Sequence, residues 1–144
     1  MNPNERGASL VEFALTLPLL LLVLVAAVDL GRAFYTYVAI TNAAREGARF
    51  GASFPSNTSG IRDRVRKEVE NTNLTIPDGQ IASPQCYTYV DDSYAYGSSV
   101  ACSSAVSGDY IKVQVNYPFN FITGYVIGLG SVTMSQSATM AIHE

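Results

Sequence analysis

Two residues near the N-terminus, Gly7 and Glu12, suggest a function by their types and by the spacing between them. Glu12 is a carboxylate near the start of a nearly unbroken apolar run from Leu10 to Val28, and Gly7 precedes it by five positions. An acid inside a segment of membrane-spanning length is costly, so a residue of this kind is by default a candidate functional site. We therefore single out Glu12.

The second pair of chemically capable residues is Cys86 and Cys102, which are not in a C-x-x-C motif. They flank a loop rich in Tyr, Ser, Gly and Asp. In an exported domain they predict one disulfide, which would close a loop of about 16 residues and stabilise the fold by around 3 kcal/mol in the chain-entropy model. The alternative is a pair of unpaired cytosolic thiols. A metal site would need further ligands, and the only histidine is His143.

The remaining residues do not indicate an enzyme. The sequence has no paired carboxylates in an evident site, no Gly-rich phosphate loop and no G-x-S-x-G motif, and we interpret the adjacent Asp91 and Asp92 as a solvated loop pair. We therefore predict no catalytic residue, no metal and no cofactor. The net charge of −3 does not suggest a nucleic-acid partner. Tyrosine-rich loops suit adhesion, and the loop between the cysteines carries Tyr87, Tyr89, Tyr94 and Tyr96.

The apolar run from Leu10 to Val28 is about 28 Å long as a helix, close to the thickness of a bilayer core. Pro18 interrupts it, which membrane helices tolerate. The alternative is a cleaved secretory signal. However, the run exceeds the usual core of roughly 7 to 15 residues, no clean A-x-A site follows, and Glu12 lies inside it. We expect a retained span, whose orientation the flanking charges do not determine.

The helix is predicted to continue over residues 29–52, which contain no proline. Small residues recur there at every fourth position, and this spacing places them on one helix face. Glycine inside a helix is unfavourable, so we interpret this face as a site where another backbone approaches closely. The alternative is a helix that frays between Gly47 and Gly51. The candidate assembly face consists of Ala39, Ala43, Gly47 and Gly51.

The rest of the chain predicts a short helix and an antiparallel sheet. Residues 61–72 carry an apolar stripe at every fourth position and a basic run that we interpret as a solvated face rather than a lipid contact. Short strands are expected at 85–90, and alternating patterns predict half-buried strands at 110–117 and 132–142. Residues 120–130 are an apolar connection, either a short helix or an exposed hydrophobic loop that lies near the membrane or a partner. The predicted fold class is α+β, with a long N-terminal transmembrane helix packed on a small antiparallel sheet and one additional short helix.

Three motifs resemble those of one family. The segments RGASLVEFALTLPLLLLVL, DLGR and NAAREGAR look like the TadE-like family of pilin-like minor subunits of the tight-adherence, or Flp, pilus. The later YIKVQVNYPF segment resembles that family's C-terminal region. The resemblance spans residues 6–52 and, more loosely, 110–142.

This resemblance implies cleavage by a prepilin peptidase between Gly7 and Ala8. Residues 1–7 would be a leader, residues 8–30 the transmembrane half of the long helix, and residues 31–144 an exported α+β domain. It further implies that Glu12 neutralises the free amine of the mature chain. The chain would be held in the inner membrane by a single pass, with its C-terminal domain outside the cytoplasm and open to incorporation in a pilus.

We therefore expect a non-enzymatic, membrane-anchored minor pilin or pseudopilin that takes part in assembling a Tad-type pilus. The expected partners are the membrane, the prepilin peptidase, and other pilin-like subunits or further copies of this chain in a filament. Two alternatives remain: the main structural subunit of a pilus-like filament, and a surface adhesion module. The length of the chain argues against the very short major pilin of that system.

Overall fold

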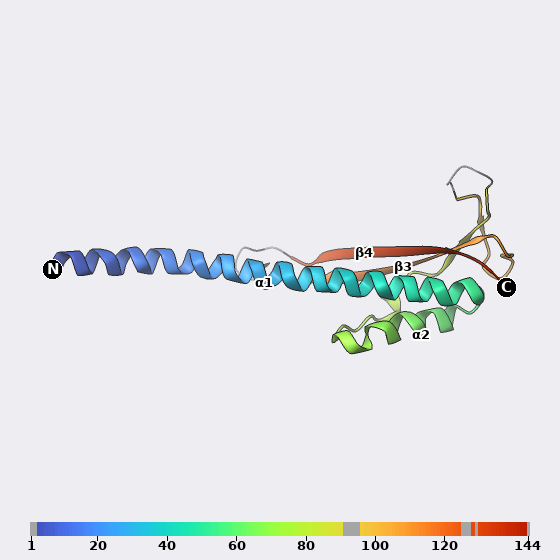
Figure 1. Ribbon diagram of the computed structural model, residues 1–144, viewed down its shortest axis with the longest axis horizontal. Helices are drawn as coiled ribbons and strands as arrows, with labels where there is room; N and C mark the ends of the chain where they lie inside the picture. Colours follow the sequence, from blue (N-terminus) through green and yellow to red (C-terminus); the bar gives the residue numbers. More distant parts are fainter. Residues whose placement is uncertain (1–2, 91–95, 125–127, 129, 144) are drawn as a thin grey trace. The chain divides into compact units, whose positions relative to one another are not determined.

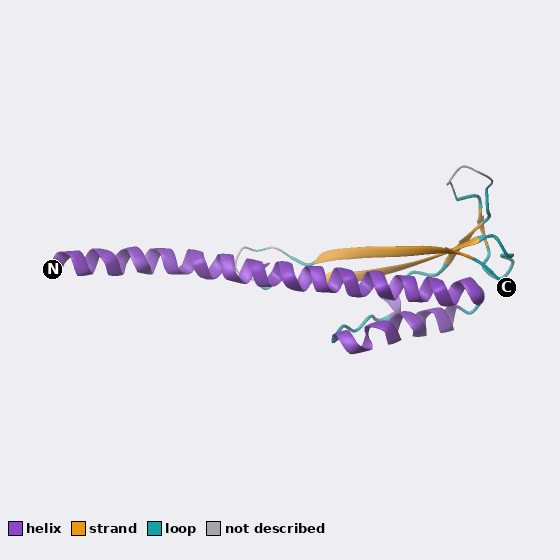
Figure 2. Cartoon of the chain, in the orientation of Figure 1, coloured by secondary structure: helices purple, strands orange, loops and turns teal. Residues whose placement is uncertain are grey.

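The structure is a computed structural model that describes residues 3–90, 96–124, 128 and 130–143. It confirms the predicted α+β class, because a long N-terminal helix packs on a four-stranded antiparallel sheet with one further short helix (Figure 2). The elements are α1 (Pro3–Ser53), α2 (Thr58–Val69), β1 (Gln85–Tyr87), β2 (Ser99–Val100), β3 (Tyr110–Phe119) and β4 (Val132–Ala141), with the short 3₁₀ helices η1 (Glu70–Thr72) and η2 (Asp78–Gln80).

Helix α1 is continuous from Pro3 to Ser53. The predicted continuation beyond the apolar run is therefore confirmed, and the alternative of a helix that frays at Gly47 is wrong. Proline is favourable at the first helical position, because its missing N–H would have no partner there. Pro18 lies inside the helix without ending it. The boundaries expected at residues 7 and 30 remain predictions.

The chain divides into two compact parts, which we describe separately. The first part comprises residues 1–34 and 119–132. Its half of α1 carries a run of large apolar side chains that point to solvent, from Leu10 to Leu24. By length and composition this helix can cross a membrane. It is therefore compatible with a single membrane anchor.

The second part comprises residues 35–118 and 133–144 and contains the hydrophobic core. The core forms where the small-residue face of α1 meets α2 and the inner face of the sheet. The stripe predicted on α2 is confirmed, because Ile61, Val65 and Val69 are all buried. The buried cluster consists of Ile40, Ala43, Ala44, Ala48, Ala52, Ile61, Val65, Val69, Ile76, Ile81, Cys86, Ile111, Val113, Val115 and Ile142.

The sheet has the strand order β2-β1-β3-β4. Figure 1 shows β3 and β4 as two long neighbouring strands. The alternation predicted for β3 is confirmed, because Ile111, Val113 and Val115 are buried while the residues between them are partly exposed. The inward row predicted for β4 is only partly correct, since Val132 is 51% exposed. The reason is that β4 is an edge strand, and an edge strand is covered less than an inner one.

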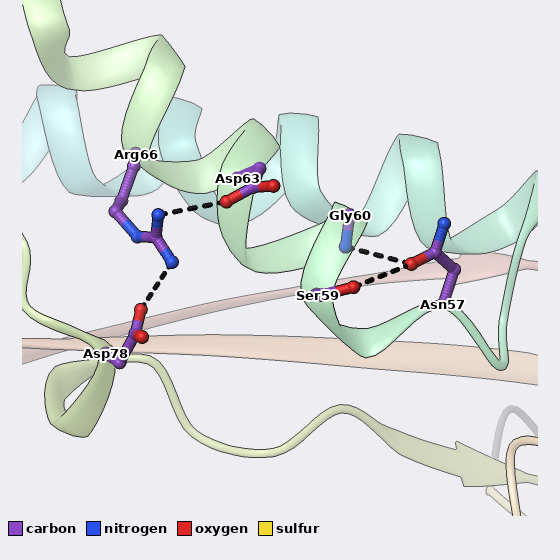
Figure 3. Close-up of polar contacts among 6 residues, drawn as sticks. All are labelled: Asn57, Ser59, Gly60, Asp63, Arg66 and Asp78. Atoms are coloured by element: carbon purple, nitrogen blue, oxygen red, sulfur yellow. Dashed lines mark hydrogen bonds and ion pairs between the residues drawn. The ribbon is translucent and has the colours of Figure 1, made fainter.

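Polar contacts define the start of α2 and connect it to η2 (Figure 3). Asn57 caps the helix, because its side-chain oxygen accepts a hydrogen bond of 3.0 Å from the backbone N–H of Gly60. Arg66 forms ion pairs with Asp63, at 2.9 Å, and with Asp78, at 2.5 Å. Arg66 therefore joins an acid of its own helix to an acid of a later segment.

Gly47 and Gly51 lie where three elements meet. A methyl group built on Gly47 would come within 2.5 Å of a Val65 methyl carbon of α2 and 3.2 Å of a Val113 methyl carbon of β3. A methyl group on Gly51 would come within 2.7 Å of Ile111. Contacts this short require the neighbouring side chains to move, and buried β-branched side chains have little freedom to do so. Glycine therefore permits the close packing of α1 on α2 and β3.

We predict that Gly47→Ala destabilises the protein although alanine is the better helix former. The gain in helix propensity is about 1 kcal/mol, whereas overpacking a tight core costs typically 1–3 kcal/mol. The net loss should be about 1 kcal/mol and at most about 2 kcal/mol, measured as a lower thermal unfolding temperature by circular dichroism in detergent.

The matched control is Gly31→Ala, on the same helix. A methyl group there meets nothing within 4 Å in the part of the chain that the structure describes, so this variant should gain roughly 0.5–1 kcal/mol. Equal stabilisation by both substitutions would show that Gly47 is not needed for packing.

Candidate functional site

Gly7, Ala8 and Glu12 lie on the exposed surface of α1 in the first part. A methyl group built on Gly7 meets nothing within 4 Å. Packing among the described residues therefore does not require glycine at this position. Glycine in a helix is about 1 kcal/mol less favourable than alanine. The presence of glycine at position 7 therefore has to be explained by something other than contacts among the described residues. The roles of these three residues in processing and assembly remain predictions.

Glu12 is surrounded along the helix by large apolar side chains. Leu10, Val11, Phe13 and Leu15 are all exposed. Together they form an apolar surface near the start of the run, and Glu12 places a carboxylate within that surface. Such a surface has to be covered by lipid or by other apolar helices, so the ionised carboxylate would need a cationic partner.

A second acid, Asp29, forms the best-defined polar site of the first part. Its side chain is only 3% exposed. One carboxylate oxygen accepts hydrogen bonds from the backbone N–H of Ile122, at 2.9 Å, and from the Arg32 guanidinium, also at 2.9 Å. The other oxygen accepts from the backbone N–H and the hydroxyl of Thr123, each at 2.8 Å. We call these four residues the Asp29 network.

Aromatic contacts extend the Asp29 network. The guanidinium carbon of Arg32 lies 5.3 Å from the centre of the Phe119 ring, within the range of a cation–π contact. The Phe119 ring in turn packs edge to face on Phe121, with 5.0 Å between ring centres. The segment 119–123 is thus held to α1 by an ion pair, backbone hydrogen bonds and aromatic packing. Of the apolar connection 120–130, residues 125–127 and 129 lie outside the described residues.

Sequence reasoning assigned no role to Asp29. The available signal was its position, because it is the first charged residue after Val28 and is followed by Gly31 and Arg32. An acid at the end of a membrane-length run resembles the ordinary polar boundary of a span. Its partners Ile122 and Thr123 are more than 90 positions away, so no local pattern could identify them.

The candidate assembly face lies in the second part. Ala39, Ala43, Gly47 and Gly51 are all buried. Gly47 and Gly51 pack against side chains of α2 and β3. The close approach expected at this face therefore occurs within the chain's own domain. A role of these four residues in contacts between subunits remains a prediction.

The predicted disulfide joins Cys86 and Cys102, with 5.2 Å between their Cα atoms. Cys86 lies on β1 within the core. Four tyrosine rings pack near the loop that the disulfide closes: Tyr96 lies 5.5 Å from Tyr87 and 5.9 Å from Tyr110, and Tyr89 lies 6.2 Å from Tyr110. Tyr94, which was also predicted for this surface, lies outside the described residues.

Asp109 is the buried acid beside these rings. Its carboxylate accepts hydrogen bonds from the backbone N–H groups of Val106, at 3.0 Å, and Tyr89, at 3.2 Å. It thereby holds two loops together, which is a structural role. Across the described ranges, no three His, Cys, Asp or Glu side chains gather as metal ligands do.

An exposed apolar helix that continues into a disulfide-bonded α+β domain defines a pilin-like protein. The family described as TadE-like protein matches residues 7–49, so this segment is a TadE-like domain. The looser resemblance at residues 110–142 lies outside the match. The family implies a role in Tad pilus assembly and an association with pilus components, and its members are typically non-enzymatic. No curated protein and no solved structure matches the chain.

We predict that Asp29→Ala loosens residues 122 and 123 without unfolding the second part. The substitution removes the acceptor of two backbone N–H groups and leaves Arg32 without its partner. Amide hydrogen exchange at Ile122 and Thr123 should accelerate roughly tenfold or more. Mass spectrometry of peptides from this segment measures the rate.

The control is Asp63→Ala, which removes an exposed acid that also pairs with an arginine three positions away. This exposed ion pair should contribute little, so exchange at Ile122 and Thr123 should not change. Unchanged exchange in Asp29→Ala would show that Asp29 does not hold the segment.

Proposed function

We propose that this protein is a membrane-anchored minor pilin-like subunit that takes part in assembling a Tad-type pilus after cleavage between Gly7 and Ala8. The observation that carries the proposal is Gly7 itself. It is an exposed helical glycine that packing among the described residues does not require, and the TadE-like match begins at this residue. Recognition by a prepilin peptidase accounts for a glycine at this position.

Cleavage would give Glu12 a partner. The new amine would be at Ala8, four positions before Glu12, and residues four apart lie on the same face of a helix. Cleavage would also place Glu12 close to the positive end of the helix dipole, which favours a carboxylate. An ion pair between Glu12 and an Ala8 amine, in the same or a neighbouring subunit, would offset much of the cost of placing the acid among apolar helices.

The exposed apolar half of α1 supports an anchor that leaves the membrane when the subunit enters a pilus. Its side chains are not used in the core of the second part, so lipid and neighbouring pilin-like helices can both cover them. The Cys86–Cys102 disulfide supports placing the domain outside the cytoplasm. The proposed partners are therefore the inner membrane, the prepilin peptidase and other pilin-like subunits.

The main-subunit alternative concerns the same surface. A filament made of this chain would use α1 in contacts between identical copies, and the exposed run from Leu10 to Leu24 could serve there too. We favour the minor role because the exported domain proposed for residues 31–144 exceeds what the very short major pilin of the Tad system carries. If isolated fibres contained this chain as their main component, the minor-subunit proposal would be wrong and the main-subunit alternative would take its place.

We predict that Glu12→Gln reduces incorporation of this subunit into pili roughly tenfold or more, because an unpaired amine would remain in an apolar bundle. The amount of the protein in the membrane should not change. Immunoblots of sheared pili and of membranes measure the two pools.

The matched control is Glu68→Gln, which makes the same chemical change on the exposed face of α2. It should not affect incorporation. Intact masses of the membrane-extracted wild type and of Glu12→Gln should both lack residues 1–7. An intact leader in the wild type would refute the processing proposal, and normal incorporation of Glu12→Gln would remove the proposed role of Glu12.

The tyrosine cluster favours adhesion as a second candidate function. The rings of Tyr87, Tyr89, Tyr96 and Tyr110 pack into one aromatic cluster, and Tyr89 and Tyr96 are each more than half exposed. Aromatic side chains of this kind give large contact areas at a low cost in conformational entropy. The cluster would be presented by the exported domain.

We predict for this candidate that Tyr96→Ser lowers attachment of cells to a polystyrene surface several-fold and leaves the number of pili unchanged, because Tyr96 contacts two other rings of the cluster. Val106→Ser, which changes another exposed apolar residue of the same region, should leave attachment unchanged. Loss of pili in Tyr96→Ser would favour a structural role of the loop over adhesion.

A further inference from the structure

Exposed apolar side chains lie at the end of the apolar run and close in sequence to the residues of the Asp29 network. On α1 they are Val28, Leu30 and Phe34, and on the segment held by Asp29 the exposed side chain is Ile122. All of them belong to the first part of the molecule. We call these four residues the collar surface.

The Asp29 network removes the main obstacle to placing this surface in a bilayer interface. An irregular segment carries backbone N–H groups, and such groups are costly to bring near lipid unless they are hydrogen-bonded. Asp29 accepts from the N–H groups of both Ile122 and Thr123. The charge of Asp29 is in turn paired with Arg32, so the segment presents Ile122 without unsatisfied donors at those two positions.

The position of the Asp29 network along the axis of α1 indicates which layer of a bilayer would surround it. Asp29 directly follows Val28, the last residue of the apolar run. From Asp29 to Phe34 the helix rises about 8 Å, similar to the headgroup layer of roughly 5–8 Å on each side of a bilayer core. The Arg32 side chain is about half exposed, and an arginine at this height can reach lipid phosphates while its stem stays among apolar groups.

We propose that the collar surface lies in the lipid headgroup region, so that Ile122 on the segment held by Asp29 makes a second membrane contact beside the helix. The proposal rests on the single-span anchor proposed above. Lipid is the occupant that the observations favour, because the surface is continuous with the apolar run and lies at its end. A contact away from the helix axis would restrict rotation of α1 about its own axis in the membrane.

The test uses tryptophan as a reporter, since the chain contains none. Three single variants of the full chain are placed in vesicles of phosphatidylcholine and phosphatidylglycerol: Leu20→Trp in the run, Ile122→Trp in the collar surface and Val106→Trp in the second part. Lipids brominated near the glycerol backbone or at the middle of the acyl chain quench tryptophans at the corresponding depths. Side chains at all three positions are exposed, so each reporter has room.

The expected result is strong quenching of Leu20→Trp by the deep bromines and of Ile122→Trp by the shallow bromines, with Val106→Trp unquenched. Emission of Ile122→Trp should lie to the blue of Val106→Trp. If Leu20→Trp is quenched and Ile122→Trp is not, the proposed membrane contact of the collar surface is overturned and the single-span anchor is unaffected. Blue-shifted but unquenched emission would also overturn it, in favour of a protein partner. Unquenched Leu20→Trp would overturn both proposals.

A second substitution tests the role of Asp29 as the residue that positions Ile122. In the Ile122→Trp background, Asp29→Ala should reduce shallow quenching to the level of Val106→Trp. Thr123→Val removes one hydroxyl donor and keeps both backbone N–H donors, so it should preserve most of the quenching. Full quenching in Asp29→Ala would show that Ile122 reaches the membrane without the network, and would overturn the positioning role.

Discussion

The close approach of α1 to α2 and β3 is the packing constraint on which the second part of the molecule depends. At Gly47 and Gly51 the space of a side chain is occupied by Val65 and Ile111. Because the three elements meet there, β3 can bury its alternate residues, and β1 and β4 then pair with β3 on either side. The small residues of α1 are thus explained by packing within a single chain. Their presence alone does not indicate a contact with another subunit.

The N-terminal half of α1 differs from the C-terminal half, because its apolar side chains are exposed and do not belong to that core. A helix of this kind needs lipid or other helices around it, and these surroundings penalise every unsatisfied polar group. Glu12 and Asp29 represent two solutions to this penalty. Asp29 is satisfied within the chain by four hydrogen bonds, whereas the partner proposed for Glu12 would arise only after cleavage.

The parts of the fold that could be predicted from the sequence are those whose signal is local. Apolar spacing of four identified the buried stripe of α2, and alternation identified the inner face of β3. Features that depend on distant segments could not be predicted in this way. The exposure of Val132 follows from strand order, the pairing of Arg66 with Asp78 from the return of the chain, and the partners of Asp29 from a contact across more than 90 residues.

The disulfide has a consequence for the order of events in the life of the chain. Cys86 belongs to the buried core, and its strand pairs with both β2 and β3. Disulfides persist in oxidising compartments rather than in the cytosol. If the domain is exported as proposed, the bond between Cys86 and Cys102 therefore forms only after the chain has crossed the membrane. The stability that the Cys86–Cys102 disulfide supplies would then be present only on the side of the membrane where a pilus would be used.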